Sequence, residues 1–119
     1  MKNMKELHYN LSCRLFTDEK CFGPGIAELL HRVERLHSLR AAAAEMEMAY
    51  SKAWTIVKHA EASLDIKLLL STTGGKNGGG AALTPEGTAL LQAYDRFCAQ
   101  LRQVGDELFQ KEFKVFFEE

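Results

Sequence analysis

The sequence predicts an α+β fold that is mainly α-helical. Apolar residues recur at helical spacing over residues 25–63, where we expect three consecutive helices, and again after residue 84. Between these regions, two short apolar stretches flank a glycine-rich segment, which is typical of a two-stranded hairpin. Three helices, a hairpin and a long last helix form the layout of a winged helix-turn-helix domain, with an N-terminal strand before it and a C-terminal dimerisation helix after it.

Size and composition fit one domain over residues 1–119. Hydrophobic residues make up 46% of the chain, which is enough for a core. No apolar run approaches the roughly 18 residues of a membrane span, so we expect no membrane partner. The N-terminus lacks the apolar middle of a signal peptide. Three widely spaced cysteines argue against a disulfide framework and fit a reducing cytoplasm.

An N-terminal strand or hairpin is expected over residues 7–22. Apolar and polar side chains alternate through residues 7–16, as in a half-buried strand. The apolar face would carry Leu7, Tyr9, Leu11, Cys13 and Leu15. After a polar turn, Cys21 and Phe22 could pair back as a short second strand.

The three-helix unit can be divided by its turn and cap signals. We expect the first helix at about 25–37 and the second at 39–46, with Ser38 as the N-cap of the second. A tight turn over residues 47–49 would lead into a third helix over residues 50–63. A three-residue turn between two helices is what a helix-turn-helix requires, and the third helix would then enter the major groove of DNA.

The wing is expected over residues 64–83. It would contain a strand within 64–71, a tip at 74–80 and a short return strand at 81–83. Glycines at the tip would let the backbone approach DNA closely, and Lys76 could meet a phosphate.

The last helix is expected over residues 84–117, where Thr84 and Pro85 form a good helix start. Apolar residues within it are spaced 4, 3, 4, 3 and 4, close to the 3.5-residue period of a coiled-coil seam. We therefore expect dimerisation through Leu90, Tyr94, Phe97, Leu101, Val104 and Leu108.

The third helix has one apolar and one polar arc. The apolar arc holds Tyr50, Ala53, Trp54, Val57, Ala60 and Leu64, so Trp54 is expected in the core. The candidate DNA-binding residues are Arg40, Ser51, Lys52, Thr55, Lys58, His59, Lys76 and Asn77. Ser51, Lys52 and Thr55 would meet base edges, whereas Lys58 and His59 are better placed for the backbone. A polar arc also occurs on any amphipathic helix, and that interpretation stays open.

The remaining motifs do not indicate an enzyme. In GGKNGGG the lysine follows the second glycine and Asn77 stands where a P-loop has Ser or Thr. The four histidines form no i, i+4 pair and lie near no cysteine pair, so we expect no metal site and no cofactor. No base is placed to activate a cysteine nucleophile.

The segments FGPGIAELLHRVE, SLRAAAAEMEMAYSKAW and TTGGKNGGGAALTPEG closely resemble the DNA-binding domain of molybdate-responsive ModE regulators, which are related to the winged domain of LysR-type regulators. The resemblance covers about residues 7–105. It implies a dimer paired through the first strand and the long last helix. It also implies that Ser51, Lys52 and nearby residues contact DNA, and that Gly74–Gly80 form the wing.

The chain departs from this family's pattern in three ways. Full-length sensors carry a C-terminal oxyanion-binding domain, for which a chain ending at Glu119 has no room, so we expect no oxyanion ligand. Glu47 stands in the helix-turn-helix turn where glycine is usual, which implies a different turn or strain. Ala49 stands where a capping serine is typical, a change that costs roughly 1 kcal/mol.

The sequence therefore predicts a homodimeric, sequence-specific transcription regulator that binds double-stranded DNA in the cytoplasm, with residues 50–63 in the major groove and residues 74–80 on the flanking backbone. The alternative is a winged-helix protein-interaction module with weakened or lost DNA binding. The net charge of −1, the acid at Glu47 and the phenylalanine-rich end motivate this alternative.

Overall fold

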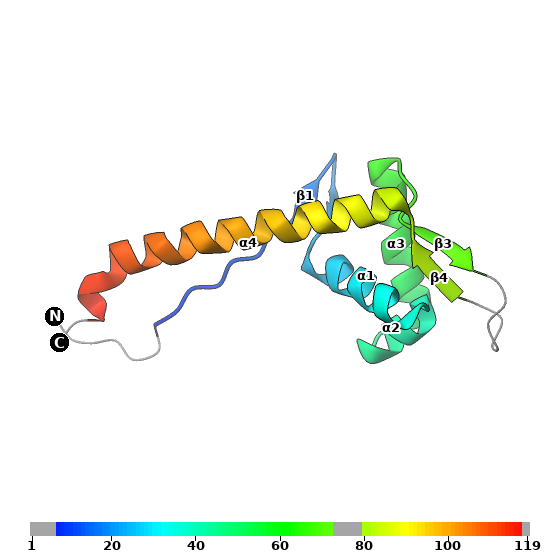
Figure 1. Ribbon diagram of the computed structural model, residues 1–119, viewed down its shortest axis with the longest axis horizontal. Coiled ribbons are helices and arrows are strands. Elements are labelled where there is room, and N and C mark those ends of the chain that lie inside the picture. The colour runs from blue at the N-terminus through cyan, green and yellow to red at the C-terminus, as the bar shows by residue number, and fades with distance from the viewer. Residues whose placement is uncertain (1–6, 73–79, 118–119) are drawn as a thin grey trace.

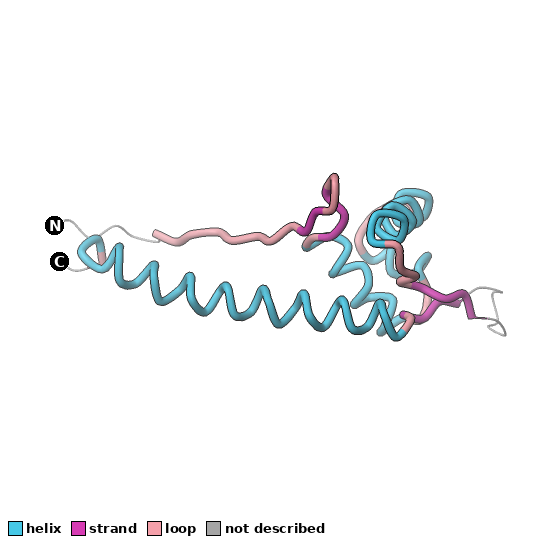
Figure 2. The backbone as a smooth tube through the Cα atoms, turned by 90° about the horizontal axis from the view of Figure 1, so that it is seen from above, coloured by secondary structure: helices cyan, strands magenta, loops and turns pink. Residues whose placement is uncertain are grey.

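The structure, a computed structural model, describes residues 7–72 and 80–117. Three helices and a hairpin form a compact head, and one long helix, α4 (Pro85–Phe113), runs out from it (Figure 1). The molecule measures 63 × 29 × 21 Å. Beyond the head, residues 7–14 lie beside α4 (Figure 2), and little else of the described chain covers that part of the helix. No helix in these residues is long and apolar enough to cross a membrane.

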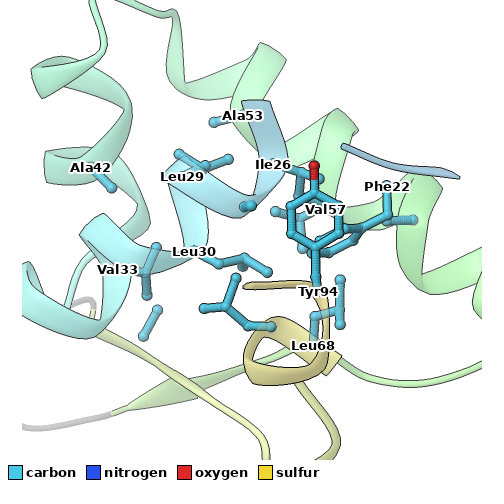
Figure 3. Packing of buried hydrophobic residues seen from close by; sticks show 14 of the residues in the cluster. Phe22, Ile26, Leu29, Leu30, Val33, Ala42, Ala53, Val57, Leu68 and Tyr94 are labelled. Atoms are coloured by element: carbon cyan, nitrogen blue, oxygen red, sulfur yellow. The ribbon is translucent and has the colours of Figure 1, made fainter. Parts of the chain in front are cut away.

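The head is built on α1 (Pro24–Leu36), α2 (Leu39–Glu45) and α3 (Tyr50–Leu64), within two residues of the predicted bounds. The predicted N-cap of α2 is confirmed, because Ser38 Oγ accepts a hydrogen bond from the Ala41 N–H at 3.0 Å. The core is made mainly by α1 packing on the other elements, and Figure 3 shows its closely packed aliphatic side chains. Alanines of α2 and α3 are fully buried there, which lets the helices approach closely.

The turn between α2 and α3 adopts the left-handed conformation that glycine favours, although its residue is Glu47 (φ 54°). The Glu47 N–H bonds to Ala44 O at 3.0 Å and the Met48 N–H to Ala43 O at 2.9 Å, which is the Schellman closure of a helix end. The turn geometry of the fold is therefore kept at the cost of backbone strain at a non-glycine residue.

The hairpin consists of β3 (Leu69–Thr72) paired antiparallel with β4 (Gly80–Leu83). A hydrogen bond of 3.0 Å from the Ala81 N–H to His37 O attaches it to the end of α1. The predicted strand within 64–71 began too early, because α3 runs to Leu64 and ends at Asp65 with φ 56°. The predicted tip at 74–80 lies outside the described residues except for Gly80.

Helix α4 starts as predicted. Thr84 Oγ1 accepts from the Gly87 N–H at 2.8 Å and donates to Lys67 O at 2.6 Å, so one hydroxyl caps the helix and fixes it to the chain before β3. A Cβ atom at Gly87 would lie 2.5 Å from Leu68 O, so this close approach requires glycine. The helix ends at Phe113 and is followed by a short 3-10 helix, η1 (Lys114–Phe116). The predicted end of the α-helix at residue 117 is therefore four residues too late.

The N-terminal region differs from the prediction. A short hairpin pairs β1 (Leu15–Phe16) with β2 (Lys20–Phe22), but residues 7–14 have no strand partner within the described part of the chain. They lie extended beside α4 (Figure 2), with alternate side chains half-buried. Tyr9 donates to Asp106 at 2.5 Å, and Tyr94 donates to Cys13 O at 2.8 Å. The alternation correctly predicts one covered face, and within the described part of the chain that face lies against α4 and not in a sheet.

The phenylalanine-rich end packs on itself and on the N-terminal segment. Phe109 lies 5.1 Å from Tyr9, 5.1 Å from Phe113 and 5.5 Å from Phe117, measured between ring centroids. Such ring pairs stabilise contacts beyond the area that they bury. The Tyr9–Phe109 pair joins the N-terminal segment to the outer half of α4.

Candidate nucleic-acid interface

The N-terminal half of α3 presents polar side chains that its own chain leaves largely unused. Ser51, Lys52 and Thr55 are exposed on adjacent turns. Thr55 Oγ1 donates to Ser51 O at 2.9 Å, which leaves the oxygen of that hydroxyl free to accept. Lys52 makes no ion pair among the described residues. These are the residues predicted to meet base edges, and the structure brings them together on one surface.

Arg40, the predicted contact on α2, lies beside this surface. Its guanidinium carbon is 4.1 Å from the centroid of the Tyr50 ring, a cation–π distance. The contact joins α2 to the first residue of α3 and holds the exposed Arg40 next to the start of α3.

Lys58 and His59 were also predicted to face DNA, which stays a prediction, and the structure shows that both make contacts within the chain. Lys58 Nζ lies 3.2 Å from Glu61 Oε1. His59 Nε2 lies 3.2 Å from Glu19 Oε1 and 3.3 Å from Lys20 O, so it contacts the β1–β2 hairpin. Helical periodicity correctly placed them on the polar arc, but it does not tell which polar residues the fold itself uses.

Glu61 is a residue that the sequence reasoning missed. It is 8% exposed, and its Oε2 accepts from the N–H groups of Leu68 at 2.8 Å and Leu69 at 3.2 Å. Burial on its own would raise the pKa of this carboxyl, but those backbone hydrogen bonds and Lys58 outweigh burial and lower the pKa. Glu61 thus ties α3 to the start of the hairpin. The available signal was a lone acid beside the apolar arc of the helix.

Trp54, on the apolar arc of α3, was predicted to lie in the core, and this prediction is wrong; Tyr50 on the same arc is also exposed. Trp54 is 48% exposed and Tyr50 is 38% exposed. The buried arc is centred on Ala53, Val57 and Ala60, whose side chains are short enough for α1 to pack against α3. Trp54 lies about 100° from Ala53 around the helix, at the edge of this arc.

The start of α3 has no side-chain cap. Ala49 occupies the N-cap position with an extended backbone and makes no cap hydrogen bond, and no acid lies in the first turn. The first N–H groups of the helix and the positive end of its dipole therefore point outward without a side-chain partner from the cap. Exposed Glu47 places one negative charge nearby.

The remaining predicted contacts, Lys76 and Asn77, lie outside the described residues. The strands that lead to them form the end of the molecule away from the free end of α4 (Figure 1).

The outer half of α4 carries an uncovered apolar stripe. Phe97, Val104 and Leu108 are each about half exposed (50%, 52% and 50%), and Leu101 between them is half-buried. Tyr94, predicted in the same seam, instead lies in the core, where its ring is 5.0 Å from that of Phe22 (Figure 3). Leu90 also packs against the core. The first two positions of the predicted seam therefore lie inside the head, and pairing through the other four stays a prediction.

A groove of about 580 Å³ lies between α1, α4 and residues 11–13. The arginines on its α1 side already pair with acids: Arg32 with Glu28 and Glu45, and Arg35 with Glu45. Arg35 and Arg32 lower the pKa of the Glu45 carboxyl. No group of three metal-ligating side chains occurs among the described residues.

The fold and this surface can be compared with known proteins. Residues 27–88, more than half of the chain, match the family described as "Bacterial regulatory helix-turn-helix protein, lysR family". The chain belongs to this lysR family. The match spans the helix-turn-helix, the hairpin and the start of α4.

Curated relatives include regulators named ModE. The chain is 39% identical over 99 residues to the transcriptional regulator ModE of Haemophilus influenzae, covering 80% of this chain and 36% of that protein. It is 33% identical over 97 residues to the DNA-binding transcriptional dual regulator ModE of Escherichia coli, covering 82% and 35%. A match of 41% over 66 residues to the molybdenum-pterin-binding protein MopB of Rhodobacter capsulatus covers 56% and 24%. The chain thus spans about a third or less of these relatives' length.

Among solved structures, the chain resembles ArgP from Mycobacterium tuberculosis with a TM-score of 0.53. The sequences are 22% identical, and the match covers 74% of this chain and 31% of ArgP. At this identity the likeness supports the winged helix-turn-helix fold of the lysR-family domain and nothing finer.

Proposed function

We propose that this lysR-family chain is a sequence-specific transcription regulator that binds double-stranded DNA, with α3 in the major groove. The observation that carries the proposal is the exposed set Ser51, Lys52 and Thr55 on the N-terminal half of α3, flanked by Arg40. In helix-turn-helix proteins this part of the recognition helix contacts base edges. Hydroxyl groups and cations are the donors that base edges and phosphates accept from.

A homodimer is part of the proposal. The exposed stripe of Phe97, Leu101, Val104 and Leu108 supports pairing of α4 with α4 of a second copy, which would cover apolar surface that one chain leaves in water. Two copies of α3 would then reach successive major grooves of a roughly palindromic site. Lys76 and Asn77 in the wing would follow the flanking backbone. The regulator would work in the cytoplasm, and the proposal involves no catalysis, cofactor, metal or oxyanion.

The test is a fluorescence-anisotropy titration of the purified protein against DNA fragments that it selects from genomic DNA, at two salt concentrations. Few cations lie on the proposed DNA-binding surface, so the affinity for DNA should be moderate and should fall as the salt concentration rises. The double variant Arg40→Ala plus Lys52→Ala should lose most of its affinity. The matched control Arg96→Ala plus Lys111→Ala removes the same charge from exposed positions on α4 and should bind as wild type does.

The result against the proposal would be that no fragment is selected, or that both double variants bind equally well. A protein-interaction module is the second candidate, favoured by the same apolar stripe on α4 together with the net charge of −1. Under that reading the protein co-purifies with a different protein in stoichiometric amount and without DNA. A homodimer that selects DNA and brings down no such protein excludes the second candidate.

A further inference from the structure

Two aromatic side chains follow each other along the flank of the proposed DNA surface. Tyr50 and Trp54 are one helical turn apart on α3, and both are exposed (38% and 48%). Around the helix they lie between the buried arc of Ala53 and Val57 and the exposed pair Ser51 and Thr55. They contribute little to the core, so burial within the head does not account for their size.

A cation accompanies each ring. The Arg40 guanidinium lies 4.1 Å from the centroid of Tyr50, and Lys58 Nζ lies 5.6 Å from the centroid of Trp54. Glu61 also pairs with Lys58, at 3.2 Å. The aromatic pair therefore has a polar side chain at each end and an open apolar face between them, which is typical of a recognition surface.

The chemistry of the major groove indicates what such a face can contact. Hydroxyl and cationic side chains read donors and acceptors on base edges, but the C5-methyl of thymine offers only an apolar contact. Ser51 and Thr55 lie beside Trp54 on α3 and serve the first role. Trp54 lies in the same turn of α3 as Thr55 and has a large apolar surface, which can exclude water from a methyl group.

We infer that Trp54, assisted by Tyr50, determines specificity by contacting thymine methyl groups in the major groove. This inference rests on the proposed function and adds the kind of base that the surface selects. It makes Trp54 a determinant of sequence preference, separate from Lys52, whose charge serves all sequences alike.

The experiment uses a duplex that the wild-type protein selects from a random-sequence library. Each thymine is replaced in turn by deoxyuridine, which removes the methyl group and keeps base pairing. Wild-type affinity should fall about fourfold at one or two positions in each half-site, the factor expected when one buried methyl is lost. Trp54→Ala should be insensitive to deoxyuridine at those positions, whereas Trp54→Phe should keep part of the effect.

The outcomes separate the two claims. If no duplex is selected, the proposed function fails and this inference fails with it. If duplexes are bound but deoxyuridine changes nothing, or if Trp54→Ala keeps the full sensitivity, the inference alone is overturned. The deoxyuridine scan of the wild-type protein needs no variant and can overturn the inference by itself, and if Trp54→Ala does not fold, Trp54→Phe assigns the effect to Trp54 by reducing the sensitivity at the same positions.

Discussion

The two ends of α3 are held in different ways. Near the C-terminal end, Lys58, His59 and Glu61 all bond within the chain, and Glu61 accepts two backbone N–H groups at the start of the hairpin. Near the N-terminal end, Ala49 provides no cap, Glu47 holds a left-handed backbone, and Lys52 and Trp54 face solvent. One amphipathic helix thus contacts the hairpins through one end and leaves polar and aromatic side chains exposed at the other.

This difference gives the sequence changes at the open end a physical meaning. Ala49 and Glu47 are both unfavourable for local structure, and neither affects the buried contacts of Ala53, Val57 and Ala60. The head tolerates a weak start to α3 because packing and Glu61 hold the rest of the helix.

The largest effect is expected at the anchored end. Glu61→Ala removes the acceptor of the Leu68 and Leu69 N–H groups and leaves a buried donor unpaired. The free energy of unfolding should fall by about 2–3 kcal/mol. Urea unfolding followed by far-UV circular dichroism, at one fixed protein concentration, measures it.

The control for this variant is Glu107→Ala, which removes an exposed acid from α4. It should change the free energy of unfolding by less than about 0.5 kcal/mol. Equal losses for the two variants would show that Glu61 does not anchor α3 to the hairpin.

At the open end, Ala49→Ser should be stabilising. A serine hydroxyl at the N-cap position can accept from an N–H group in the first turn, as Ser38 does for α2 at 3.0 Å. The expected gain is about 1 kcal/mol in the free energy of unfolding. Ala62→Ser, at an exposed position near the other end of α3, is the matched control and should give no gain. A gain shared by both variants would contradict the capping explanation.

Glu47→Gly should also stabilise the open end, by about 0.5–1 kcal/mol. Glycine relieves the left-handed strain at φ 54° but loses more chain entropy on folding, so the net gain is smaller than the strain itself. Glu47→Ala is the comparison, because it removes the charge and keeps the Cβ atom. Equal thermal unfolding midpoints for Glu47→Gly and Glu47→Ala would show that the left-handed backbone at this position is not strained.

Acid should weaken the anchored end. The folded pKa of Glu61 lies below its ordinary value of 4.5, so the unfolded chain binds more protons. The contribution of Glu61 to stability is therefore complete above that value and is lost as the pH falls through the folded pKa. Glu61→Gln should show a shallower loss of stability below pH 4.5 than the wild type. The free energy of unfolding is measured by urea unfolding at a series of pH values. If it falls equally in both proteins as the pH is lowered, Glu61 is not the group responsible.

Much of the fold could be read from the sequence because its signals are local. The Ser38 and Thr84 caps, the turn at residues 47–49 and the apolar periodicity of α1 each depend on a few neighbouring residues. The partner of an extended segment is not local. Residues 7–14 alternate as a strand does, yet what covers them is α4, about ninety residues later in the chain.

The candidate site was less predictable for a related reason. The pattern of α3 separates polar from apolar positions, but packing distance decides which apolar residues are buried. Ala53 and Ala60 are fully buried, whereas Trp54 at the edge of the apolar arc is 48% exposed. Likewise, the capture of Lys58 by Glu61 depends on the burial of Glu61 beneath the hairpin, which the pattern of one helix does not contain.

Under the proposed function, Lys52 contacts the DNA backbone, whereas Lys58 stays paired with Glu61. Lys52→Ala and Lys58→Ala each remove one positive charge from the same helix, six residues apart. The measurement is the dependence of DNA affinity on salt for both variants, with the selected duplex and fluorescence anisotropy. Lys52→Ala should weaken binding about tenfold and reduce the slope of log affinity against log salt by about one per protomer, and Lys58→Ala should leave the slope unchanged. Equal changes in the slope for both variants, or a larger change for Lys58→Ala, would contradict a DNA contact through Lys52 and not through Lys58.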